Sequence, residues 1–259
     1  MNQVIIPLNA FDRKQVLENG QLSFISMIKE SGAYGAEIRR ELFSEQELPL
    51  KQIREEMTGS LFTVYSAPVE LWKLNGTLNE DEILEMKAEA LVLGASWMKV
   101  SLGHYIKGVS DLEKLNQLLN QFDSMELLIE NDQTPHGGNA EILRSFFESA
   151  SIAGVPVKMT FDTGNWLYAN ENPIEAFGML KAFVAYLHLK NVVPSGNGFI
   201  TTELSNSETA DWRKIAEQLP ENLPRALEFP IYPVSRLKEF IEMVHPYKTN
   251  TKGEAVCKS

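Results

Sequence analysis

The sequence has little of what several classes of protein depend on. Cys257 is the sole cysteine among 259 residues, so no disulfide can form within the chain, which is typical of a reducing compartment. No apolar run approaches the roughly 20 residues that span a membrane, and the N-terminus does not show a charged stretch followed by an apolar export segment. We therefore expect a cytoplasmic protein without a membrane partner.

Positive charge is also scarce. The chain has 24 lysine and arginine residues against 35 aspartate and glutamate residues, which gives a formal net charge of -11. Proteins that bind nucleic acid normally carry a basic excess or patch, because contacts to phosphate supply much of their affinity. The charge balance disfavours a nucleic-acid partner and favours a small-molecule ligand.

The apolar content is sufficient for one large core. Apolar residues make up 44% of the chain and charged residues 23%, as in an ordinary globular protein. The length is close to the roughly 250 residues of a single (β/α)₈ barrel. We assign residues 1–248 to one such domain and expect residues 249–259 to form a disordered tail.

Short apolar, β-branched or aromatic runs alternate with longer amphipathic stretches, which is the pattern of parallel strands alternating with helices. The candidate strands are residues 4–6, 35–38, 61–65, 97–100, 127–130, 157–161, 185–189 and 226–229. Candidate helices include residues 79–93, 111–122, 139–153, 212–219 and 234–244. Ser110 is the expected N-cap of the second helix, and Gly154 is expected to end the third.

The eight candidate strands favour a closed barrel, since closure removes both sheet edges and uses all the repeats equally. The alternative is an open, doubly wound sheet that binds a dinucleotide. That fold carries a Gly-x-Gly-x-x-Gly turn after its first strand, whereas this chain has Pro7, Leu8, Asn9 and Ala10 there. The predicted fold class is therefore α/β, a single (β/α)₈ TIM barrel.

Functional side chains of a parallel barrel stand at the carboxyl ends of its strands. The last four candidate strands end in, or lead into, an acidic residue or a histidine: Glu130, Asp162, His188 and Glu228. Their spacings of 32, 26 and 40 residues each suit one strand–helix unit, so the barrel should bring them to one rim. Three carboxylates and an imidazole can bind one divalent ion, Mn²⁺, Mg²⁺, Co²⁺ or Zn²⁺. A proton-sharing acid pair is the alternative without a metal.

The sequence around these residues consists of four motifs: Ile129-Glu130-Asn131, Phe161-Asp162-Thr163-Gly164-Asn165, His188-Leu189-Lys190 and Leu227-Glu228-Phe229. In this order they resemble the xylose isomerase-like barrels, a superfamily of sugar isomerases and epimerases that also contains inosose dehydratases and endonucleases of the family 2 type. The resemblance implies that the four residues bind the metal and that Glu130 and Glu228 exchange protons with the substrate. Glu37, at the end of the second candidate strand, resembles a further active-site residue of these enzymes.

Two positions depart from the family's pattern. Asn165 stands where many epimerases have a substrate-binding histidine, and Asn191 replaces the aspartate that often follows His-x-Lys. The endonuclease branch uses a histidine-rich cluster of several metals, whereas this chain has four histidines in all. The resemblance is therefore stronger to the sugar-directed branches than to the endonucleases.

The function expected from these observations is isomerisation or epimerisation of a small ketose or sugar phosphate, by proton transfer through an enediolate that a divalent metal stabilises. Loss of hydroxide at the same site would make the protein a keto-polyol dehydratase, and a non-catalytic sugar-binding barrel is the third alternative. Candidate substrate-binding residues are Glu37, His104, Asn165 and Lys190. Residues 192–207 are a candidate lid or substrate loop, with a solvated connection as the alternative, and association into a homo-oligomer is left open.

Overall fold

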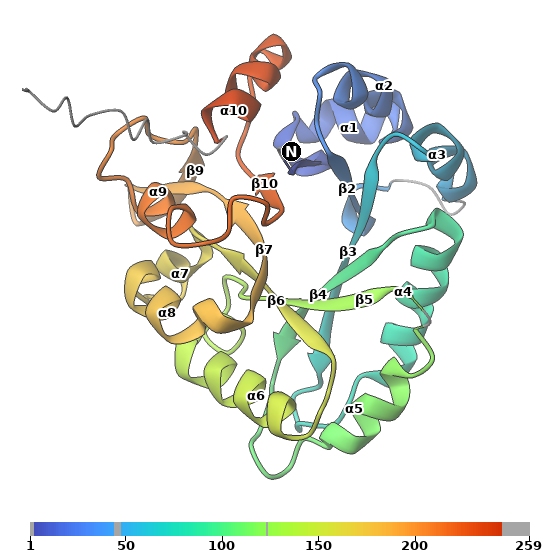
Figure 1. The fold of residues 1–259 in the computed structure, drawn as a ribbon, viewed down its shortest axis with the longest axis vertical. Helices are drawn as coiled ribbons and strands as arrows, with labels where there is room; N and C mark the ends of the chain where they lie inside the picture. Colours follow the sequence, from blue (N-terminus) through green and yellow to red (C-terminus); the bar gives the residue numbers. More distant parts are fainter. Residues whose placement is uncertain (1–2, 44–47, 123, 245–259) are drawn as a thin grey trace, which may run out of the picture.

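The structure is a computed structural model that describes residues 3–43, 48–122 and 124–244. Within these residues eight parallel strands form a closed barrel in the order β1-β10-β7-β6-β5-β4-β3-β2, and helices cover its outside (Figure 1). The barrel strands are β1 (Val4–Pro7), β2 (Gly35–Arg39), β3 (Phe62–Trp72), β4 (Trp97–Gly103), β5 (Glu126–Glu130), β6 (Val157–Asp162), β7 (Val184–Leu189) and β10 (Arg225–Leu227). The predicted (β/α)₈ barrel is confirmed, while the predicted tail at 249–259 lies outside the described residues.

The described helices have a short polar side chain as N-terminal cap in four cases, and a glycine follows the last residue in two cases. Their bounds are α1 (Arg13–Asn19), α2 (Leu22–Glu30), α3 (Leu50–Met57), α4 (Glu80–Leu93), α5 (Leu112–Leu119), α6 (Ala140–Ile152), α7 (Asn165–Tyr168), α8 (Pro173–Leu180), α9 (Asp211–Ala216) and α10 (Leu237–Met243). The predicted cap of α5 was wrong: Asp111 accepts a hydrogen bond from the Lys114 amide, whereas Ser110 donates to the Gly76 carbonyl. None of the described helices has the length and apolar character that crossing a membrane requires.

Inside the barrel the side chains change from apolar to charged toward the carboxyl ends of the strands. Because side chains alternate along a strand, Leu128 and Glu130 of β5 point to the same side, and so do Tyr186 and His188 of β7. An apolar layer of Ile5, Val64, Leu128, Tyr186 and Ala226 fills the lower part of the barrel. The charged residues therefore pack against a buried apolar layer, which separates them from solvent at the amino ends of the strands.

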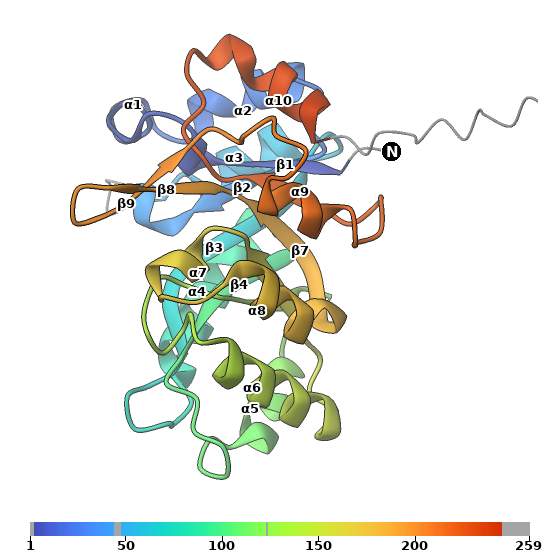
Figure 2. The same cartoon turned by 90° about the vertical axis from the view of Figure 1, so that its left-hand side faces the viewer.

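A hairpin follows β7 where the sequence predicts a loop. Strands β8 (Asn191–Ser195) and β9 (Gly198–Thr202) pair antiparallel, and Gly196 adopts a φ of 58° in the turn between them. The hairpin extends beyond the barrel, at the left of Figure 2. Thr201 of β9 lines the cavity at the carboxyl ends of the strands. Residues 192–207 thus include an ordered arm that contributes to this cavity.

Candidate active site

A cavity of about 540 Å³ lies over the carboxyl ends of the barrel strands. Its walls come from segments far apart in the sequence, and their polar and charged members include Asn9, Arg39, Ser66, Lys99, Ser101, Glu130, Gln133, Asn165, Lys190, Thr201 and Glu228. Carboxyl ends of strands are the usual place for an active site in this architecture. The predicted site residues should therefore lie at this cavity.

The four predicted metal ligands meet at this cavity. Glu130, Asp162, His188 and Glu228 each offer one ligand atom, and these atoms all lie within 4.8 Å of one another. His188 Nδ1 is 2.8 Å from Glu228 Oε2 and 3.1 Å from Glu130 Oε1. Asp162 and His188 are fully buried, whereas Glu130 and Glu228 border the cavity. Strand ends that are distant in sequence thus form one cluster, as their spacing predicts.

Backbone and side-chain hydrogen bonds fix the Asp162 carboxylate. The amides of Gly164 and Asn165 both donate to Asp162 Oδ1 at 2.8 Å, at the start of α7. The Asn131 side chain accepts from the Asp162 amide and donates to its carbonyl, which ties β5 to β6. The second oxygen, Oδ2, is therefore left to face the other members of the cluster.

Three cations lie among the carboxylates. Lys99 Nζ is 2.8 Å from Glu130 Oε2 and 3.1 Å from Glu37 Oε1. Lys190 Nζ is 3.0 Å from Asp162 Oδ2 and 3.3 Å from Glu228 Oε2. The third cation, Arg39, has Nη1 at 2.9 Å from Glu37 Oε1 and 3.1 Å from Glu228 Oε1. These contacts offset much of the negative charge of the cluster.

Glu37 lies beneath the four-residue cluster and is fully buried. Its Oε2 accepts a hydrogen bond from Tyr186 Oη at 3.0 Å and lies 3.1 Å from His188 Nε2. Burial alone raises the pKa of Glu37, but Lys99, His188 and Arg39 outweigh it and hold that pKa well below its usual range. Glu37 is thus an anion that orients the imidazole, and it is not among the residues that line the cavity.

The carboxylates of the cluster differ in proton affinity. Burial, together with the charges of Glu228 and Glu130, raises the pKa of Asp162 to about 7 although Lys190 opposes the rise. In contrast, the pKa of Glu228 is well below its usual value, because Lys190, His188 and Arg39 outweigh the effect of burial. Burial and Lys99 lower the pKa of His188, but the carboxylates of Glu37, Glu228 and Glu130 together raise it well above its usual value. Without a metal, protons on Asp162 and His188 would relieve the repulsion between the carboxylates.

The donor set fits a divalent metal. Carboxylate and imidazole ligands suit Mn²⁺, Co²⁺ and Zn²⁺, and carboxylates also suit Mg²⁺. Glu130 Oε1 and Asp162 Oδ2 are buried and accept no hydrogen bond from the described residues, although His188 and Lys190 lie within ion-pair distance of them. Buried polar oxygens normally find a partner, so these two atoms are suited to a cation at the centre of the cluster.

The predicted substrate-binding residues occupy different places. Asn165 and Lys190 line the cavity, and Lys190 Nζ donates to Asn165 Oδ1 at 3.0 Å. His104 is not among the lining residues and instead lies beside Glu70 and His136, outside the four-residue cluster. Lys99 was not among the predicted site residues, although a lysine between Met98 and Val100 in an apolar strand is a signal that could have identified it.

Comparison with known proteins shows similarity only at the level of structure. No protein-family model matches the sequence, and no curated protein matches it. A xylose isomerase domain protein from Planctomyces limnophilus has a TM-score of 0.62 and 12% identity, over 94% of this chain and 95% of that chain. The IolI protein with a bound zinc atom has a TM-score of 0.63 and 13% identity, over 93% and 95% of the two chains.

A third solved structure is that of the 3-keto-D-glucoside 4-epimerase YcjR from E. coli in its apo form. Its TM-score is 0.63 at 13% identity, and the match covers 94% of this chain and 99% of that chain. Identities this low show the fold alone, and the matches extend over nearly the full length of each chain. The chain therefore has the (β/α)₈ barrel fold that it shares with these structures.

Proposed function

We propose that this protein is a divalent-metal-dependent isomerase or epimerase of a small ketose or sugar phosphate. The observation that carries the proposal is the placement of two glutamates at one cavity: Glu130 and Glu228 both border it and both contact His188 Nδ1. Two carboxylates beside one substrate can remove a proton and return one. The metal ligands in this proposal are Glu130, Asp162, His188 and Glu228.

The cations of the cluster lower the pKa of both glutamates and so weaken them as bases. Lys99 opposes the effect of burial on Glu130, and Lys190 does the same for Glu228, so both glutamates have a lowered pKa and remain anionic near neutral pH. Anions with low proton affinity are weak bases, and the C–H bond they attack must be acidic. A divalent ion held by the four ligands would supply positive charge to the substrate's carbonyl oxygen and acidify the adjacent C–H bond.

The reaction then consists of two proton transfers. One glutamate takes the proton from the carbon next to the carbonyl, the C–H electrons form the carbon–carbon double bond, and the carbonyl electrons move to oxygen to give an enediolate. For epimerisation the other glutamate, which rests as an anion, takes a proton from solvent and delivers it to the opposite face of the same carbon, and the first glutamate then releases its proton to solvent. For isomerisation the proton returns to the neighbouring carbon, and a second proton moves between the two oxygens.

The walls of the cavity support a hydroxylated substrate. Asn9, Ser66, Gln133 and Thr201 bring amide and hydroxyl groups to the same space as the charged cluster. Such groups both donate and accept hydrogen bonds, which suits the hydroxyls of a sugar. In this proposal Asn165 and Lys190 bind substrate oxygens, while Glu37 acts through the orientation of His188.

The test is exchange of substrate hydrogen with solvent. Purified protein, treated with a chelator and reloaded with Mn²⁺, Co²⁺, Zn²⁺ or Mg²⁺, is incubated in D₂O with a panel of ketoses, their phosphates and keto-polyols. NMR detects deuterium at the carbon beside the carbonyl, and mass spectrometry follows the products. We expect metal-dependent exchange, and we expect both Glu130→Gln and Glu228→Gln to abolish it.

A matched control separates chemistry from folding. Glu126 lies at the opposite end of the same strand as Glu130 and pairs with Lys158 near the surface, so Glu126→Gln should leave exchange unchanged. Full exchange in a Glu130→Gln, Glu228→Gln double variant would overturn the catalytic assignment. Loss of water from a substrate would show the dehydratase instead, and tight sugar binding without exchange would show a binding protein.

A further inference from the structure

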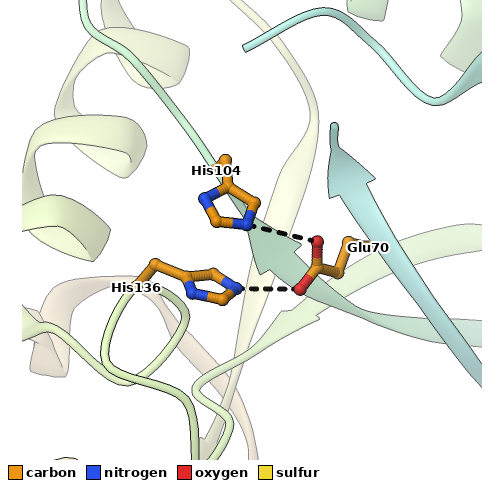
Figure 3. Close-up of side chains that lie close together, drawn as sticks. All are labelled: Glu70, His104 and His136. Atoms are coloured by element: carbon orange, nitrogen blue, oxygen red, sulfur yellow. Dashed lines mark hydrogen bonds and ion pairs between the residues drawn. The ribbon is translucent and has the colours of Figure 1, made fainter. Parts of the chain in front are cut away.

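A second group of metal-ligating side chains lies outside the four-residue cluster. Glu70 of β3, His104 after β4 and His136 after β5 each offer a ligand atom, and these atoms lie within 4.8 Å of one another. Figure 3 shows the two imidazoles approaching the same carboxylate, each with a nitrogen toward a different oxygen. We propose that these three residues bind a zinc ion at a site separate from the four-residue cluster.

Hydrogen bonding explains only one of the two contacts between the imidazoles and the Glu70 carboxylate. His136 Nε2 is 2.8 Å from Glu70 Oε1, whereas His104 Nε2 is 3.9 Å from Oε2, which is too long for a hydrogen bond. The two rings are stacked, with centroids 3.8 Å apart and planes inclined by 19°. Both imidazoles thus converge on one carboxylate although only one of them is hydrogen-bonded to it.

The backbone of β3 and β4 brings Glu70 and His104 together. The pairing of these strands shifts in register between Ser66 and Glu70 and then continues to Trp72, whose carbonyl accepts a hydrogen bond from the His104 amide at 2.9 Å. Gly103, directly before His104, has a φ of 68°, and a Cβ there would lie 2.4 Å from the Trp72 carbonyl oxygen and 2.7 Å from Glu70 Cβ. The close approach of Glu70 and Trp72 to the backbone of residue 103 therefore requires a glycine there.

The loop after β5 fixes His136 through its own hydrogen bonds. Asp132 Oδ1 accepts from the Thr134 amide and hydroxyl, and Thr134 Oγ1 accepts from the Gly137 amide. Gly138 closes the turn with a bond to the Thr134 carbonyl at 2.8 Å. His136 thus stands in a compact turn, which lowers the entropy that binding would otherwise cost.

The ligand set suits zinc. Two histidines and one glutamate are a ligand combination of zinc sites that keep a fourth position open for water or substrate. Glu70, His104 and His136 are each partly exposed, so an ion can reach them from solvent. Asp132 and Gln133, from the loop that carries His136, line the cavity, so this loop connects the proposed zinc site to the space where substrate is proposed to bind.

The test measures Co²⁺ binding, because this ion replaces zinc and has visible absorption that depends on its ligands. Protein freed of metal by a chelator is titrated with Co²⁺, and bound metal is measured after gel filtration. We expect about two ions per chain in the wild type, one of them lost in a His104→Gln, His136→Gln variant. An Asp162→Asn, His188→Gln variant should keep the ion at Glu70 and lose the other.

Each outcome separates the two sites. Unchanged stoichiometry and absorption in the His104→Gln, His136→Gln variant would overturn this inference, as would loss of all binding in the Asp162→Asn, His188→Gln variant. A single bound ion that is lost in the His104→Gln, His136→Gln variant and kept in the Asp162→Asn, His188→Gln variant would support the inference. It would also contradict the four-residue metal site. If the double histidine variant does not fold, Glu70→Gln replaces it and should lose the same ion. In the wild type, zinc should then shift the NMR signals of the His104 and His136 imidazole nitrogens, and unchanged signals would overturn the inference.

Discussion

Lys99 Nζ lies 2.8 Å from Glu130 Oε2, and the lysine side chain is 1% exposed. A buried ammonium at this distance means that Glu130, a proposed metal ligand and proton carrier, already has a cation beside it. Among the described residues of the buried cluster, Lys99, Lys190 and Arg39 face the carboxylates of Glu37, Glu130, Asp162 and Glu228. One negative charge is left over when His188 is neutral, and a metal or a proton on His188 offsets it.

Removal of the Lys99 charge should destabilise the protein. In a Lys99→Met variant the buried carboxylates of Glu37 and Glu130 lose a partner, and breaking a buried ion pair costs about 3–5 kcal/mol. Lys158→Met is a matched control, because Lys158 makes the same type of contact with Glu126 between β6 and β5 but both side chains are about half exposed. That change should cost at most about 1 kcal/mol. Urea unfolding of both variants measures the difference, and equal losses would contradict this account.

The same substitution should strengthen metal binding. Two unit charges about 4 Å apart interact by about 4 kcal/mol at an effective dielectric constant of 20, so a neighbouring ammonium opposes a metal ion at Glu130. We expect Lys99→Met to bind Co²⁺ at the four-residue cluster about tenfold more tightly than the wild type does, in a chelator competition assay. Lys158→Met should match the wild type. If Lys99→Met binds the ion no better, the ammonium and the metal do not share Glu130.

The fold could be predicted from the sequence because the repeat that produces it is local. Eight apolar runs separated by amphipathic helices locate the strands to within a few residues, and β3 and β4 differ from the prediction mainly by extending farther, to Trp72 and Gly103. The convergence of Glu130, Asp162, His188 and Glu228 followed from the geometry of a parallel barrel. Each of these inferences needs only the order of residues along the chain.

Features that depend on contacts between distant segments could not be predicted. The place of His104 results from the register shift in β3 and from the loop that carries His136, neither of which has a periodic signature. The position of Lys99 between two carboxylates becomes visible only when the barrel closes and brings side chains of β2, β4 and β5 together in its interior. The hairpin β8–β9 pairs residues on both sides of a glycine turn, in a segment rich in polar residues that favours the prediction of a loop.

Metal affinity at the four-residue cluster should increase with pH. Burial, with the charges of Glu228 and Glu130, raises the pKa of Asp162 to about 7, and the surrounding carboxylates raise the pKa of His188. Below pH 7 these groups hold protons that the ion must displace, so affinity should fall as pH decreases by up to about tenfold per unit for each proton released. Above pH 7 Asp162 is ionised, and the remaining dependence comes from His188. Calorimetric titration with Mn²⁺ at several pH values, in buffers of different ionisation enthalpy, counts the protons, and an affinity independent of pH would contradict the proposed ligands.

Gly103 should be essential for the geometry of the Glu70 site, and a second glycine offers a control. Gly103→Ala would introduce a Cβ that clashes with the Trp72 carbonyl and with Glu70, in addition to the strain of a φ of 68°. Gly108→Ala has similar backbone strain at a φ of 80°, but nothing lies within 4 Å of its Cβ. We expect the strain alone to cost about 1–2 kcal/mol at Gly108 and the clash to add further destabilisation at Gly103. Because β3 and Glu70 must move away to accommodate the methyl group, Gly103→Ala should also weaken Co²⁺ binding at Glu70, His104 and His136, while Gly108→Ala leaves it intact. Equal unfolding free energies and equal Co²⁺ binding in the two variants would show that the approach of β3 to Gly103 is not what positions Glu70.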